Sequence, residues 1–162
     1  MYVGDYRTGP AWGYTIGFDE TLNQPEVIVF DVPSRSAAVL FEKVFKELRA
    51  GLLILEDGMI WPPGEPHACV WRKVHPSHID CEEGWFTLAL HRRARVTGKR
   101  FGLEAFQFVL SDNDGRLPWE VGYDEALRAL QPALYLPHDA PAATCGEARP
   151  VTPDADRAGQ LR

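Results

Sequence analysis

The sequence predicts a single compact α+β domain, in which a mixed, mostly antiparallel sheet is covered by one long amphipathic helix and one or two shorter helices. Three observations lead to this prediction. Short apolar runs with the character of strands recur along the chain, one segment has the apolar period of a helix, and turn-forming residues separate them. The length of 162 residues is typical of one domain. We place that domain at residues 1–136.

The first two strands are predicted near the start of the chain. Large side chains alternate with small ones along Trp12–Phe18, as expected of a strand with one bulky face. Pro25–Phe30 is a β-branched apolar run without alternation, which is typical of an interior strand covered on both faces. Because glycine weakens a strand, Gly13 and Gly17 indicate that another element or a ligand comes close to the first strand.

The long helix is predicted between Pro33 and Gly51. Its apolar residues follow the i, i+3, i+4, i+7 rule and therefore share one face, which needs a sheet to cover. Glu42 and Lys46 are spaced to pair on the opposite, solvated face. The apolar residues are Ala37, Leu40, Phe41, Val44, Phe45 and Leu48.

The middle of the chain contains a loop, a strand and a helix. Proline and glycine interrupt regular structure in residues 57–66, so we expect a loop there. Residues 68–74 predict a strand that ends before Pro76. Residues 83–96 fit either a helix or a strand by their apolar period, and we favour the helix.

The last elements surround a turn. Residues 103–110 alternate as a strand does, and Asp112–Gly115 then supplies a tight turn. Residues 123–130 predict a brief helix that ends at Gln131-Pro132, because proline blocks continuation. Residues 137–162 are rich in Pro, Ala, Thr, Gly and Asp and predict a disordered tail.

Composition and charge restrict the possible partners and location. The formal net charge of −6 repels a phosphate backbone, so we expect no nucleic-acid partner. No apolar run approaches the ~20 residues needed to cross a bilayer, and no secretion signal is visible. Three cysteines, an odd number at irregular spacing, predict free thiols in a reducing compartment. We therefore expect a cytoplasmic protein. The basic segment 91–100 is interpreted as a solvated face.

Four segments carry a resemblance to a known family. They are Tyr14–Gly17 (YTIG), Pro25–Phe30 (PEVIVF), Asp114–Trp119 (DGRLPW) and Gln131-Pro132. Their order and spacing resemble the bacterial domain of unknown function 4262 family over most of the chain. The resemblance implies a small α+β domain and no particular activity. It also implies a strand before the YTIG segment. Because only residues 1–9 precede this region, we expect either that this strand is truncated or that the start codon has been assigned too late.

A metal site is one possibility that the sequence leaves open. Cys69, His75, His78 and Cys81 are residue types that zinc accepts as four ligands. Their spacing is unlike that of zinc fingers, and no paired C-x-x-C is present, so we favour an ordinary turn after a strand. We expect no metal and no cofactor. Whether these four side chains converge is not decided by the sequence.

Seven residues form the candidate ligand site, since aromatic walls with a few polar groups make ligand pockets. They are Tyr14, Thr15, Gln107, Asp112, Arg116, Trp119 and Glu120. In the structural alternative, Trp119 fills the core beneath the hairpin, Arg116 bridges a carboxylate, and Gln131 satisfies buried backbone groups. We favour this structural alternative.

The chain shows no catalytic signature. Neither a G-x-S-x-G elbow nor a glycine-rich phosphate loop is present, so we assign no catalytic residue. The favoured function is a non-enzymatic module, of the immunity or regulatory type, that binds another protein. The alternative is a small enzyme or ligand-binding protein that uses a cleft around Tyr14, Asp112, Arg116, Trp119 and Glu120. The sequence does not decide whether the protein is an enzyme.

Overall fold

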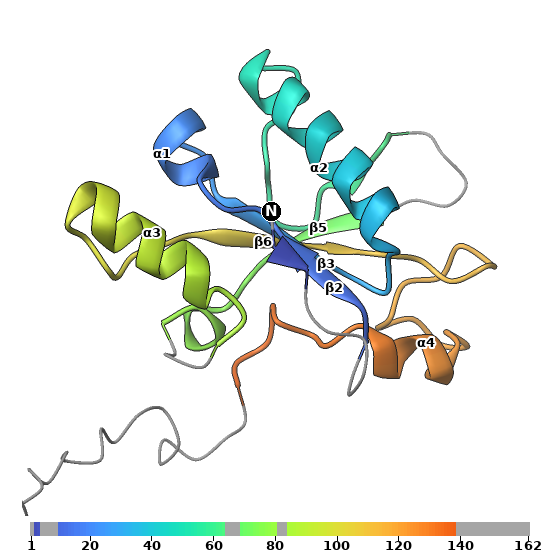
Figure 1. The fold of residues 1–162 in the computed structure, drawn as a ribbon. Helices are drawn as coiled ribbons and strands as arrows, with labels where there is room; N and C mark the ends of the chain where they lie inside the picture. The colour runs from blue at the N-terminus through green and yellow to red at the C-terminus, as the bar shows by residue number, and fades with distance from the viewer. Residues whose placement is uncertain (1, 4–9, 64–68, 81–83, 139–162) are drawn as a thin grey trace, which may run out of the picture.

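The computed structural model describes residues 2–3, 10–63, 69–80 and 84–138, and these residues form one mixed sheet with helices on both faces (Figure 1). The strands are β1 (Tyr2–Val3), β2 (Trp12–Tyr14), β3 (Glu26–Phe30), β4 (Ile60–Trp61), β5 (Cys69–Lys73) and β6 (Ala105–Val109). Their order across the sheet is β1-β2-β3-β6-β5-β4. Strands β3 and β6 are parallel, and every other neighbouring pair is antiparallel. The predicted α+β fold with a mostly antiparallel sheet is confirmed.

The two central strands supply both hydrophobic cores. Every residue of β3 and β6 is buried, as predicted for an interior strand at Pro25–Phe30. The register pairs Val27 with Phe106 and Val29 with Phe108, so these side chains share one face. Ile28 lies in the core on the other face. Because side chains alternate along a strand, each central strand serves both cores.

Helix α2 (Ser34–Arg49) covers the first face of the sheet and confirms the predicted long helix (Figure 1). Gly51 follows it with a φ of 68°, a conformation that glycine adopts easily at a helix end. The ammonium of Lys46 lies 2.7 Å from the carboxylate of Glu42, as expected on the solvated face. The buried residues of α2 are Ala37, Phe41, Val44 and Leu48.

The second face is covered by helix α3 (Thr87–Thr97), which begins and ends within four residues of the predicted helical segment. Phe86, Ala89 and Leu90 pack in this core together with Leu134 from the far end of the chain. A 3₁₀ turn at Pro76–His78 also belongs to this side of the fold. The sheet is therefore covered on both faces.

The remaining short elements differ in part from expectation. Strand β2 ends at Tyr14, and Phe18 begins helix α1 (Phe18–Leu22), so the strand predicted over Trp12–Phe18 is too long. The predicted loop 57–66 contains the two-residue strand β4. The brief helix before Gln131 is present as α4 (Glu125–Leu130).

The two ends of the chain were also the subject of predictions. Strand β1 lies before β2 and pairs with it antiparallel, where the resemblance implied a further strand. Residues 139–162 lie outside the described residues, so the predicted disordered tail stays a prediction. Among the helices described, none is long and apolar enough to cross a membrane.

Candidate functional site

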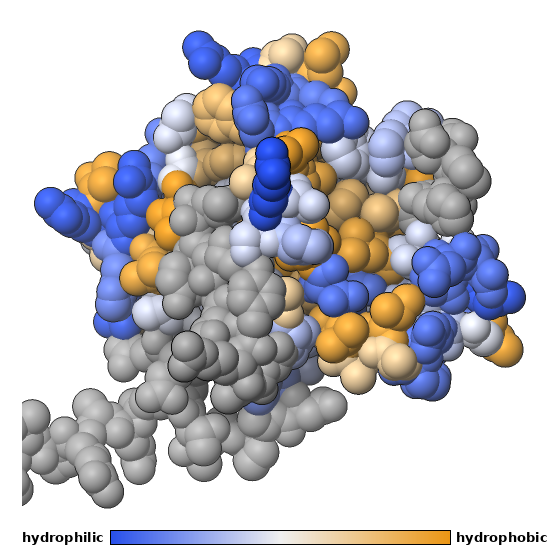
Figure 2. All heavy atoms as spheres, turned by 45° about the vertical axis from the view of Figure 1, so that its right-hand side comes forward, coloured by the Kyte–Doolittle hydropathy of each residue, from blue (hydrophilic) through white to orange (hydrophobic). Residues whose placement is uncertain are grey.

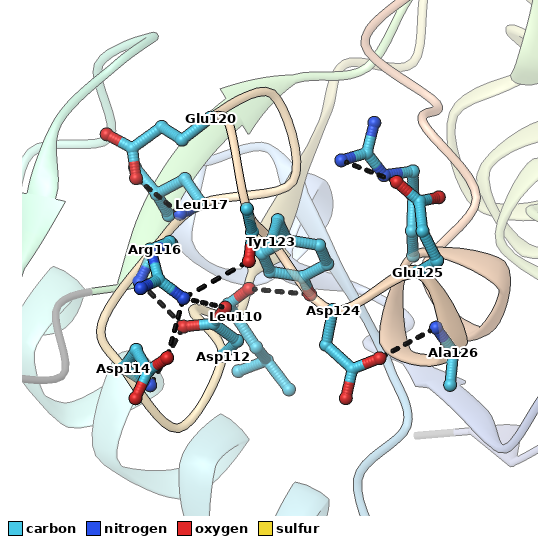
Figure 3. Close-up of polar contacts among 12 residues, drawn as sticks. Leu110, Asp112, Asp114, Arg116, Leu117, Glu120, Tyr123, Asp124, Glu125 and Ala126 are labelled. Atoms are coloured by element: carbon cyan, nitrogen blue, oxygen red, sulfur yellow. Dashed lines mark hydrogen bonds and ion pairs between the residues drawn. The ribbon is translucent and has the colours of Figure 1, made fainter.

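The loop that follows β6 is built around the carboxylate of Asp112. This side chain accepts hydrogen bonds from the backbone N–H groups of Asp114 and Arg116, at 2.9 and 2.8 Å (Figure 3). The backbone N–H of Asp112 donates to the carbonyl of Arg116, and Gly115 has a φ of 80°. These contacts confirm the predicted tight turn.

The other charged side chains of this loop also bond within it. The guanidinium Nη1 of Arg116 lies 2.6 Å from Oδ2 of Asp114 and 3.1 Å from the carbonyl oxygen of Gly122 (Figure 3). The carboxylate of Glu120 accepts a hydrogen bond from the backbone N–H of Leu117 at 2.7 Å. The predicted role of Arg116 in bridging a carboxylate is confirmed, and these residues stabilise the loop itself.

Replacing Asp112 with alanine is expected to destabilise the loop most at neutral pH. Burial alone would raise the pKa of Asp112, but hydrogen bonds from the backbone of Arg116, Asp114 and Asp124 outweigh burial and lower that pKa below its ordinary value of 3.8. A lowered pKa stabilises the fold above the ordinary value, and this contribution is lost as the pH falls through the lowered one. Urea unfolding near pH 7 and near pH 3 should show the difference between wild type and variant shrinking at the lower pH. A difference that is equal at both values would contradict this assignment.

Trp119 lies at the surface, and the prediction that it fills the core is wrong. Its side chain is 45% exposed. Its ring meets the ring of Tyr135 edge-on at a centroid distance of 5.7 Å. The guanidinium carbon of Arg72 lies 5.1 Å from the Trp119 ring and 4.4 Å from the Tyr135 ring. We refer to Arg72, Trp119 and Tyr135 as the aromatic–arginine cluster.

Arg72 is fixed within this cluster from two sides. It lies on β5, opposite Gln107 of β6. Its Nε donates to the carboxylate of Asp57 at 2.9 Å, and its guanidinium plane contacts both aromatic rings. Contacts of a guanidinium with aromatic faces stabilise by about 0.5 to 1 kcal/mol at exposed sites. Arg72 could not be assigned to this cluster from the sequence, because only the pairing of β5 with the rest of the sheet brings it to Trp119.

Tyr135 is positioned by a hydrogen-bonded segment that crosses the sheet. Gln107 donates to the carbonyl of Pro132 at 2.9 Å and accepts from the backbone N–H of Leu134 at 3.0 Å. Leu134 is buried and anchors the segment. These contacts hold the chain immediately before Tyr135 against β6. Gln107 is therefore buried beneath this surface, where it holds the segment in place and is not exposed to a ligand.

Gln131 attaches the start of this segment to the backbone of Leu110. Its amide accepts from the backbone N–H of Leu110 at 2.8 Å and donates to the hydroxyl of Tyr123 at 2.7 Å. The same amide donates to the carbonyl of Leu110 at 3.2 Å. The prediction that Gln131 satisfies buried backbone groups is confirmed.

The structure does not bring the seven candidate ligand residues into one cleft. Tyr14 is buried, and its hydroxyl accepts from the backbone N–H of Leu88 on the α3 side of the sheet. Thr15 is buried beside Glu26. A hollow of about 580 Å³ on α2 and another of about 610 Å³ beside β4 are lined by other residues of the described chain.

Glu26 forms a polar centre that the sequence analysis did not identify. It is 1% exposed, and its carboxylate accepts from the hydroxyl of Thr15 at 2.5 Å and from the backbone N–H groups of Gly17 and Phe18 at 2.6 and 3.0 Å. The hydroxyl of Thr15 in turn accepts from the backbone N–H of Val27. These bonds turn the chain from β2 into α1, which explains why β2 ends early. Burial raises the pKa of Glu26 and outweighs the hydrogen bonds that lower it.

Two arginines of the basic segment dock α3 against α1. Nε of Arg92 lies 2.7 Å from the carboxylate of Glu20, and Nε of Arg93 lies 2.6 Å from that of Asp19. The side chain of Arg93 is largely buried. The interpretation of this segment as a solvated face is therefore wrong for Arg93, and these two cations are already paired with carboxylates.

Three of the four possible zinc ligands lie in the described part of the chain. Cys69 packs against the core beneath α2, and burial raises the pKa of its thiol. His75 lies 2.9 Å from the hydroxyl of Ser77, and His78 lies 2.9 Å from the carbonyl oxygen of Leu136. Cys81 lies outside the described residues. No group of three potential ligands is found among the residues described.

Two exposed hydrophobic side chains are close in sequence to members of the aromatic–arginine cluster. Figure 2 shows one face of the molecule, on which hydrophobic residues form several patches among hydrophilic ones. Val121, two residues after Trp119, is 98% exposed, and Leu136, next to Tyr135, is 54% exposed.

Fold and surface together define a small α+β domain whose surface loop is held by its own charged side chains. The chain belongs to the family described as Domain of unknown function (DUF4262), whose profile matches residues 1–124. This confirms the family suggested by the sequence, although the Gln131-Pro132 segment lies beyond the matched residues. The matched region includes the loop with Trp119 and ends just before α4. Comparisons with curated proteins and with solved structures gave no match.

Proposed function

We propose that this protein is a non-enzymatic module of the immunity or regulatory type that binds another protein through the aromatic–arginine cluster. The observation that supports this most is the half-exposed ring of Trp119, held between Arg72 and Tyr135. Tryptophan, tyrosine and arginine are the residue types that contribute most often to the strongest contacts of protein interfaces. The net charge of −6 favours a protein partner over nucleic acid.

The rigidity of the cluster adds to this argument. Gln107 and Gln131 hold the segment that carries Tyr135, and the loop that carries Trp119 is closed by Asp112. A binding surface that is ordered before its partner arrives loses less conformational entropy on association. The cluster therefore has both the composition and the preorganisation of an interface.

The alternative function, a small enzyme or ligand-binding protein, has weaker support. General acid–base chemistry needs an ionisable group that reaches the substrate. Asp112, Arg116 and Glu120 instead bond to the backbone or to one another within the loop. We place the binding activity in the cytoplasm, where free thiols such as that of Cys69 persist.

Site-specific photo-cross-linking in native cells tests the proposed function. A photoreactive amino acid in place of Val121, two residues after Trp119, leaves every member of the cluster in place. The same amino acid in place of Leu88 on α3 is the control on another exposed surface. We expect one dominant covalent adduct with a second protein at position 121 and not at position 88. The same set of adducts at both positions, or none at position 121, would contradict the proposed interface.

A further inference from the structure

A second exposed apolar surface lies on the opposite face of the sheet, where α2 meets the edge strand β4. Leu52, Ile54 and Ile60 are 81%, 68% and 52% exposed, and all three line a hollow of about 610 Å³. Trp61 and Pro62 line it as well. We call this surface the β4-edge hollow. Large aliphatic side chains that gather at this exposure are typical of a binding groove.

The floor of the β4-edge hollow is rigid. Trp61 is buried, and its ring lies 6.0 Å from that of Trp71 and 5.6 Å from that of Phe108. Its Nε1 donates to the carboxylate of Glu47 at 3.2 Å, and the ammonium of Lys43 lies 4.4 Å from its ring centroid. The hollow is therefore formed before any partner binds.

The way a partner can bind here is limited by the chain itself. Strand β4 has only two residues and is followed by Pro62 and Pro63. Proline has no backbone N–H to donate, so an added strand would find few hydrogen bonds at this edge. A partner must then bind through its side chains. An amphipathic helix that lays apolar residues at i, i+3 and i+4 into a groove is the recognition mode that suits such a surface.

The charged side chains around the β4-edge hollow indicate which charge its partner should carry. Lys43 is already engaged with the ring of Trp61 and with Glu47, whose carboxylate is 3.9 Å away. Glu56 is exposed at the rim of the hollow, and its carboxylate has no ion-pair partner among the residues described. A second copy that docked through the same hollow would bring a second Glu56, and Lys43, the cation among the lining residues described, is already engaged. A cationic partner is favoured both by this rim and by the net charge of −6.

We propose that the β4-edge hollow binds an amphipathic helix that carries leucine or isoleucine on one face and lysine or arginine beside them. This surface lies on the α2 side of the sheet, whereas Arg72 points to the other side of β5 from Trp71. It is therefore separate from the aromatic–arginine cluster and gives the protein a second binding surface.

Two synthetic helical peptides of about 14 residues, or four turns, test this proposal. They share one leucine pattern and differ in that one carries lysine and the other glutamate at the remaining positions. Binding to the full-length protein is measured by fluorescence anisotropy. We expect the leucine–lysine peptide to bind about tenfold or more tightly than the leucine–glutamate peptide, and Glu56→Gln to weaken the former about threefold.

Aspartate variants separate binding in the hollow from general charge attraction. Ile60→Asp and Leu52→Asp add a negative charge but remove the apolar contact, whereas Val96→Asp adds the same charge on exposed α3. We expect the first two to weaken binding of the leucine–lysine peptide about tenfold and the third to leave it unchanged or tighter. Equal effects of all three, or equal binding of both peptides, would overturn the proposal. A wild-type dimer that Ile60→Asp dissociates in sedimentation would also overturn it, in favour of self-association.

Discussion

Replacing Glu26 with alanine is expected to lower the free energy of unfolding by about 3 to 5 kcal/mol, because the change leaves several buried hydrogen-bond donors without an acceptor. The hydroxyl of Thr15 and the backbone N–H groups of Gly17 and Phe18 all donate to this carboxylate in the folded protein. A loss of this size removes much of the stability of a typical domain. Urea unfolding followed by circular dichroism measures it.

Glutamine at the same position is the matched control. It keeps an acceptor for Gly17 and Phe18, so Glu26→Gln should cost clearly less than Glu26→Ala. If alanine cost no more than glutamine, the hydrogen bonds of the carboxylate would not be what holds the turn from β2 into α1. The exposed Glu42→Ala, which breaks only an i,i+4 pair, should lower the free energy of unfolding far less than Glu26→Ala.

The stability of the wild type relative to Glu26→Gln should depend on pH. Burial raises the pKa of Glu26 above its ordinary value of 4.5. A raised carboxyl pKa means that the folded state favours the protonated form, so the contribution of Glu26 to stability is largest below the ordinary value. It declines as the pH rises from there through the raised pKa. The free energy of unfolding of the glutamine variant should therefore rise relative to that of the wild type over that pH range. A difference between the two that does not change with pH would contradict the raised pKa.

Trp119→Ala is expected to abolish most of the binding to the partner identified by cross-linking while leaving the fold intact. Central aromatic anchors of an interface contribute about 2 kcal/mol or more, which corresponds to a loss of affinity of about 30-fold. The cost in unfolding free energy should be only about 1 to 2 kcal/mol, from the lost contacts with Tyr135 and Arg72. A tryptophan that filled the core would instead cost about 3 to 5 kcal/mol.

Two control variants make this result interpretable. Trp119→Phe keeps an aromatic ring and should retain more of the affinity than alanine. Trp71→Ala removes a fully buried ring and should show the large loss of stability that Trp119→Ala lacks. An intact affinity in Trp119→Ala would exclude the aromatic–arginine cluster as the interface, whatever the stability of the variant.

Local patterns predicted the main elements of this fold well. The apolar period of α2 and the unbroken apolar run of β3 are properties of contiguous residues, so the sequence alone was sufficient for both. The turn from β2 into α1 could not be predicted in this way. It depends on hydrogen bonds from Thr15 and Gly17 to Glu26, which lies 11 and 9 residues further along the chain.

The same distinction applies to the candidate site. The tight turn at residues 112–115 and the bridging of a carboxylate by Arg116 were correctly predicted, because the contacts from Arg116 to Asp112 and Asp114 lie within a few residues. Trp119 was predicted to fill the core beneath the hairpin, but its ring is 45% exposed. Its real neighbours, Arg72 and Tyr135, come from distant parts of the chain, and only the sheet order brings Arg72 to it.

Hydroxyl-radical footprinting of Trp119, in the free protein and with the cross-linked partner bound, is the most direct test of the claim that this ring is a binding surface. Trp71, which is fully buried, serves as the internal reference. We expect Trp119 to be oxidised much faster than Trp71 in the free protein and to become protected when the partner binds. Oxidation of Trp119 as slow as that of Trp71 in the free protein, or equally fast with and without the partner, would contradict the account.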